Sequence, residues 1–210
     1  MLGLLRKDLY LTASMAKSYL IICAFFIVLT VLGVYDASFL ATFLSLICIM
    51  LPVNVSAYDE QARWDKFASA LPTGRDGAVQ ARYLFTALIC LGSVVLAAVL
   101  AAAIWLLDLG GPSTLGDALL TGVLPASSGF LVNAILLPLL FKFGSQKGRL
   151  YLVVAIAVFM GCVFGALGAL SQAGVYLTSL SPLWLLPPLC LLTLYPSYCI
   201  SRAIFRRKEF

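Results

Sequence analysis

The chain has 210 residues, of which 62% are hydrophobic and only 11% are charged. A soluble domain of this size has about a quarter of its residues charged, because much of its surface faces water. The composition therefore excludes an ordinary soluble domain and predicts a protein that is covered by lipid. The sequence contains no histidine, which excludes the usual zinc sites, Ser-His-Asp and Cys-His catalysis, and the commonest general base.

Six stretches are apolar enough to predict transmembrane helices, each of which needs about 20 mostly apolar residues. They are 19–34, 38–57, 83–107, 118–141, 150–170 and 182–204. Pro52 and Pro138 lie in the second and fourth stretches and are expected to kink them. The six cysteines lie within or beside these runs without metal-ligand or redox spacing, so we expect them to be packing residues. The sequence predicts an all-α integral membrane protein, with one membrane domain over residues 1–210.

The positions of the charges predict the orientation, because Lys and Arg near span ends stay on the cytoplasmic side. With six spans, all 14 basic residues fall in the N-terminal segment, the second and fourth loops or the C-terminal tail. The first, third and fifth loops carry only Asp36, Asp108 and Asp117 as charged residues. We therefore predict that both termini are cytoplasmic, and we expect the N-terminal segment to be retained rather than cleaved as a signal peptide.

The N-terminal segment, residues 1–17, has a helical pattern. Leu2, Leu5 and Leu9 are spaced to share one helix face, while the basic residues occupy other positions. This pattern predicts a helix that lies in the inner membrane interface before the first span. The alternative is a charged flank without this role.

A second pattern, in residues 58–82, follows the second span. Trp64, Phe67 and Leu71 fall at positions i, i+3 and i+7, which is one stripe of a helix. Pro72 ends this helix, because a residue before proline disfavours the α conformation. The following residues, 73–76, resemble a capping box that opens the helix of the third span. We predict a short amphipathic helix over 58–72 that either lies on the membrane surface or docks another protein, and its balanced charges favour docking.

Known catalytic and nucleotide-binding motifs are absent from the sequence, including the GxxxxGK[ST] phosphate loop and GxSxG. Asn54 and Asn133 are candidates for a polar pathway lining, although hydrogen bonds between helices are the favoured interpretation. Small residues at four-residue spacing mark a helix-packing face, either within the subunit or across a dimer. These residues are Ala157, Gly161, Gly165 and Ala169.

Three segments of the chain resemble the small ABC-2 type transporter permeases. They are LLRKDL at 4–9, DEQARWDKF at 59–67 and LPTGRDGAVQARY at 71–83. The resemblance implies an ABC-2 exporter fold in the cell membrane of a bacterium, in which residues 58–72 form a coupling helix seated in a separate ATPase subunit. It implies a permease of two six-span subunits, identical or similar, with ATP and Mg²⁺ bound by two ATPase partners and no cofactor in this chain.

By this resemblance, the coupling helix would contact the ATPase through apolar and polar side chains. The apolar contacts would be Trp64, Phe67 and Leu71, next to the break at Pro72. The polar contacts would be Asp59, Glu60, Arg63, Asp65, Lys66 and Arg75. The cargo implied is an amphipathic peptide or a hydrophobic small molecule.

Two other classes of function remain open from the sequence. One is an immunity or sensor protein of the same fold that does not transport, and the other is a membrane enzyme with an unrecognised site. The missing histidine and the absence of acidic residues from the middle of the spans disfavour the enzyme. An adjacent reading frame with a phosphate loop would favour the exporter over the sensor.

Overall fold

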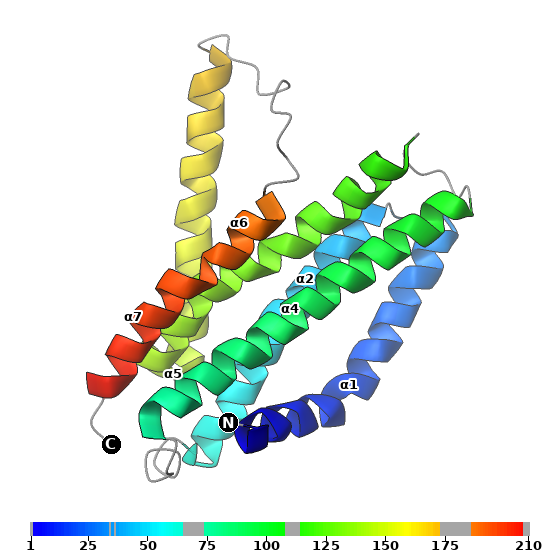
Figure 1. The fold of residues 1–210 in the computed structure, drawn as a ribbon. Coiled ribbons are helices and arrows are strands. Elements are labelled where there is room, and N and C mark those ends of the chain that lie inside the picture. Colours follow the sequence, from blue (N-terminus) through cyan, green and yellow to red (C-terminus); the bar gives the residue numbers. More distant parts are fainter. Residues whose placement is uncertain are drawn as a thin grey trace.

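The computed structural model describes residues 2–33, 35, 37–64, 74–107, 114–172 and 186–207. Within these ranges the chain is helical and contains no strand (Figure 1). The helices are α1 (Leu2–Val31), α2 (Ala37–Gln61), α4 (Gly74–Leu106), α5 (Leu115–Gln172), α6 (Leu186–Leu192) and α7 (Leu194–Arg207).

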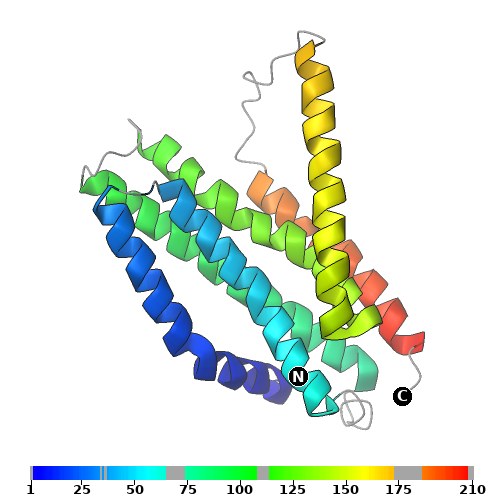
Figure 2. The same cartoon turned by 180° about the vertical axis from the view of Figure 1, so that it is seen from behind.

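The start of α1 and the end of α7 lie at the same end of the bundle, which we call the termini side (Figures 1 and 2). From there α1 leads away, α2 returns, α4 leads away and the first half of α5 returns. Four helices are long and apolar enough to cross a membrane, and they confirm the first four predicted spans: Gly3–Val31, Ser38–Gln61, Asp76–Leu106 and Leu115–Ser145. The second half of α5 leads away again and α6 and α7 lead back, so the count of six spans stays a prediction.

The N-terminal segment and the first span form one helix, whereas the sequence suggested two. The backbone is helical from Leu2 to Val31, and Figure 1 shows the helix bend between its two parts. No glycine or proline occurs between Gly3 and Gly33, so nothing in the sequence interrupts the helix. The helix ends at Val31, two residues before Gly33, which has a φ of 73°, a conformation that glycine adopts without steric cost.

Two later breaks also differ from expectation. The predicted loop of residues 142–149 is a sharp turn at Gly144 (φ 82°, ψ 176°), with helix on both sides. The last predicted span is divided into α6 and α7 at Thr193. Pro196 explains this division, because it has no N–H to donate to the carbonyl of Leu192. Pro52 and Pro138 lie inside α2 and α5.

The core lies between α2, α4, α5 and α7, and it includes the cysteines Cys48, Cys90 and Cys190. All three are buried and free, which confirms their expected role in packing. Gly122 of α5 allows close approach to α4, because a Cβ there would lie 2.8 Å from the Cβ of Ala101. The result is a tightly packed set of helices with α1 at its edge, where α1 contacts α2 and α4.

Candidate coupling site

A cluster of four charged side chains joins three helices at the termini side. Lys7 Nζ donates to Asp59 Oδ1 at 2.6 Å, and Arg82 donates to the other oxygen of the same carboxylate. Asp8 completes the set, with its oxygens 3.3 Å from Lys7 Nζ and 3.5 Å from Arg82 Nη1. We call these four residues, from α1, α2 and α4, the charge cluster. Its formal charges sum to zero.

The charge cluster is largely buried. The side chains of Asp8, Asp59 and Arg82 are 4%, 9% and 10% exposed, and that of Lys7 is 24% exposed. Removing a charge from water is costly unless an opposite charge and hydrogen bonds compensate for it. The four groups therefore stay together, and they hold the termini-side ends of α1, α2 and α4 in one arrangement.

Glu60, the next residue of α2, points to a different helix. Its carboxylate accepts hydrogen bonds from the backbone N–H of Ser145 and from the Ser145 hydroxyl, the latter at 2.7 Å. Ser145 opens the second half of α5, so the carboxylate caps a helix start, where negative charge is favoured. A Cβ at Gly144 would lie 2.9 Å from Glu60 Oε1. Glycine is therefore favoured here by its positive φ, and a larger residue would also have to displace the carboxylate of Glu60.

Successive residues of a helix point about 100° apart, so Asp59 and Glu60 reach different neighbouring helices. Asp59 binds α1 and α4, and Glu60 binds the turn within α5. The chain then leaves α2 through Arg63, which has a φ of 51°. Trp64 lies beside α1, with Lys7 Nζ 4.4 Å from the centre of its ring, within the range of a cation–π contact. We call the charge cluster together with Glu60, Trp64 and Ser145 the coupling hub.

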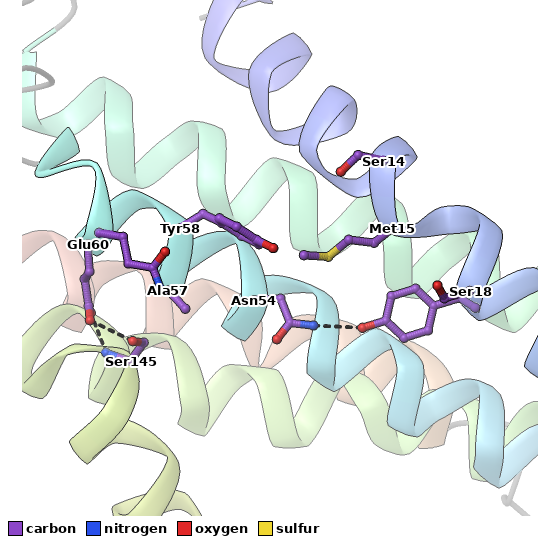
Figure 3. Close-up of a pocket in the computed structure, with 10 residues that line it drawn as sticks. Ser14, Met15, Ser18, Asn54, Ala57, Tyr58, Glu60 and Ser145 are labelled. Atoms are coloured by element: carbon purple, nitrogen blue, oxygen red, sulfur yellow. Dashed lines mark hydrogen bonds between the residues drawn. The ribbon is translucent and has the colours of Figure 1, made fainter.

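A cavity of about 750 Å³ lies next to the coupling hub, between α1 and α2 (Figure 3). Ser14 and Ser18 line it from α1, and Asn54 and Glu60 line it from α2. Asn54 Nδ2 donates to the hydroxyl of Tyr19 at 2.8 Å, which joins the two helices. The site therefore combines a buried set of charges with an open, mostly polar cavity.

The structure brings together some of the residues predicted from the sequence. Asp59, Glu60 and Trp64 meet in the coupling hub, and Arg63 is exposed beside them. The turn from Tyr58 to Gln61 is the last turn of α2, not the first turn of a separate helix. The other predicted contacts lie outside the described residues, or have a side chain that lies outside them, so their roles stay predictions. They are Asp65, Lys66, Phe67, Leu71, Pro72 and Arg75.

The two polar residues predicted within the spans both make hydrogen bonds between helices. Asn133 is fully buried, and its Nδ2 donates to the Cys48 carbonyl of α2 at 3.3 Å and to Cys90 Sγ of α4 at 3.4 Å. With the bond from Asn54 to Tyr19, these contacts agree with the favoured interpretation, while Asn54 also lines the cavity, so the choice between the two roles stays a prediction. The small residues at 157, 161, 165 and 169 belong to the second half of α5, and their packing face stays a prediction.

Four hub residues were not predicted as site residues: Lys7, Asp8, Arg82 and Ser145. Three of them lie in segments 4–9 and 71–83, where paired charges beside long apolar runs are a usable signal. Ser145 has no such signal, because a serine after a glycine is common in loops. Its role depends on the turn within α5.

The fold and this site define a helical integral membrane protein whose membrane helices are joined at one end by buried polar contacts. The chain belongs to the ABC-2 transporter family. The family model described as ABC-2 family transporter protein matches residues 3–206, nearly the whole chain, which confirms the predicted resemblance. Members of this family are the permease components of ABC transporters. Comparisons with curated proteins and with solved structures return no match.

Proposed function

We propose that this chain is the membrane subunit of an ATP-driven exporter that moves an amphipathic peptide or a hydrophobic small molecule out of a bacterial cell. Two copies, or this chain and a similar one, form the permease. Two separate ATPase subunits bind ATP and Mg²⁺. The termini side faces the cytoplasm, in agreement with the concentration of Lys and Arg in the segments that meet there.

The observation that carries this proposal is that the adjacent carboxylates of Asp59 and Glu60, at the end of α2, bind different helices. Both residues lie in the segment 58–72, which the family resemblance assigns to ATPase contact. A displacement of this segment acts first on the end of α2. It then passes to α1 and α4 through Asp59, and to the second half of α5 through Glu60.

The charge cluster makes this transmission stiff. Parting its ion pairs would leave buried charges without partners, at a cost of about 3–5 kcal/mol. A push from the ATPase therefore moves the helix ends together instead of separating them. Closure of the two ATPase subunits on ATP would in this way switch the pathway from inward-facing to outward-facing.

The docking step is tested by replacing Trp64 and Phe67 together with alanine in the assembled transporter. We expect the ATPase subunit to co-purify less, and cargo-stimulated ATP hydrolysis to fall. The matched control is the double replacement of Tyr35 and Phe39, an aromatic pair near the opposite end of α2, with ring centres 4.3 Å apart. If the Trp64 and Phe67 variant keeps both properties, residues 58–72 do not dock the ATPase. A chain that never co-purifies with an ATPase would favour the sensor function instead.

A further inference from the structure

The carboxylate of Glu60 lines the cavity beside the coupling hub, and among the described residues no cation forms an ion pair with it. Of the described residues that line the cavity, Glu60 alone carries a charge, and most of the others bear hydroxyl or amide groups. Within the described parts of the chain, no basic group lies within salt-bridge distance of Glu60. Its oxygens accept hydrogen bonds from Ser145, which carries no formal charge.

Asp59 provides the contrast within the same turn of helix. Its carboxylate is 9% exposed and meets both Lys7 and Arg82, so its charge is compensated inside the protein. Glu60 is exposed and lies at the wall of an open cavity. A negative charge in such a place attracts a cation from outside the chain.

An apolar groove lies where α1, α2 and α4 meet, and it shares one lining residue with the cavity. This groove, of about 220 Å³, is lined by Leu20 of α1, by Leu44 and Leu51 of α2 and by Ile89 and Leu96 of α4, among others. Tyr19 lines both the cavity and the groove. The polar cavity and the apolar groove therefore adjoin at Tyr19, in the seam between α1 and α2, where the tyrosine hydroxyl accepts a hydrogen bond from Asn54.

We propose that this seam binds a cationic amphiphile, with a protonated amine or quaternary ammonium head beside Glu60 and an apolar tail in the groove. The volume of the cavity is within the range of about 300–1,000 Å³ that small-molecule sites occupy. Tyr19 and Tyr58 add aromatic rings to the cavity wall, and such rings attract ammonium groups. The inference rests on the proposed function only in treating the bound amphiphile as cargo, since binding itself needs no ATPase.

The test measures binding to the purified chain in lipid nanodiscs, without an ATPase and with empty nanodiscs as background. The probes are diphenylhexatriene and its trimethylammonium derivative, which share one fluorophore and differ in charge. We expect Glu60→Gln to weaken binding of the cationic probe by up to about fivefold, as the loss of one exposed charged contact would, and to leave binding of the neutral probe unchanged. Ser145→Ala is the matched control, because it removes a hydrogen bond to Glu60 but keeps the charge, and it should retain the preference for the cationic probe.

Two outcomes would overturn the proposal. One is equal binding of the cationic probe by the unaltered chain and by Glu60→Gln. The other is an equal loss of affinity for both probes in Glu60→Gln, which would mean that Glu60 only holds the turn within α5. If Glu60→Gln does not fold, the proposal is tested on the unaltered chain by adding salt. Salt must then weaken binding of the cationic probe and leave binding of the neutral probe unchanged. None of these results depends on ATPase docking, so the proposed function is tested separately.

Discussion

Replacing Asp59 with asparagine is expected to destabilise the protein strongly. The change keeps the shape of the side chain but removes one of the two negative charges of the charge cluster. Lys7, Asp8 and Arg82 then carry a net charge of +1 in a site where Asp8 and Arg82 are 4% and 10% exposed. The uncompensated positive charge is the cause of the instability.

The magnitude follows from the burial. Breaking a buried ion pair by removing one partner costs about 3–5 kcal/mol. We expect a value near the lower limit, about 3 kcal/mol, because Lys7 is 24% exposed and keeps part of its hydration. The folded-to-unfolded ratio would fall by about a hundredfold.

The assay is chemical denaturation of the purified chain in detergent, followed by circular dichroism. Asp76→Asn is the matched control, because Asp76 pairs with Arg202 at 2.7 Å but the two side chains are 32% and 40% exposed. Such a pair contributes at most about 1 kcal/mol. The double variant Asp59→Asn with Arg82→Gln restores a net charge of zero and should be more stable than the sum of the single losses predicts, by about 1–3 kcal/mol.

Two results would refute this reasoning. The first is a decrease in the free energy of unfolding for Asp59→Asn that is no larger than the decrease for Asp76→Asn. The second is a double variant whose loss equals the sum of the two single losses. Either result would mean that the charge cluster does not act as one unit and cannot hold α1, α2 and α4 together.

The same denaturation assay tests three further predictions. Gly144→Ala should cost about 2 kcal/mol, since the new Cβ meets a carboxylate oxygen at 2.9 Å and the residue has a positive φ. Gly33→Ala should cost only about 1 kcal/mol, because it has a similar φ with nothing within 4 Å of the Cβ. Tyr83→Phe should cost about 1 kcal/mol, because its hydroxyl bonds two serine hydroxyls of α7 at 2.6 and 2.7 Å. Gly122→Ala should cost about 1–3 kcal/mol through its contact with α4, whereas Gly92→Ala, with nothing within 4 Å, should not destabilise the protein.

Each of these predictions can fail separately. Equal losses at Gly144 and Gly33 would mean that the carboxylate moves aside without cost. An unchanged stability for Tyr83→Phe would mean that α4 and α7 do not depend on this hydroxyl. A loss at Gly122 no greater than at Gly92 would contradict the close approach of α5 to α4.

The sequence alone determined that the protein lies in a membrane, where its first four membrane helices lie, and to which family it belongs. These properties depend on local features that can be read along the chain. Hydrophobic length decides whether a helix spans a bilayer. The family resemblance resides in three short segments that need no partner to be recognised.

Only the tertiary structure decided which partners Asp59 and Glu60 contact. Asp59 and Glu60 are adjacent carboxylates in one helical turn, and nothing in the local sequence indicates that they have different partners. Asp59 meets Lys7, which is 52 residues away in the chain, and Arg82, which is 23 residues away. Glu60 meets Ser145, which is 85 residues away. The packing of four helices made one carboxylate a buried partner and left the other at the wall of a cavity, because helix geometry turns neighbouring side chains toward different surroundings.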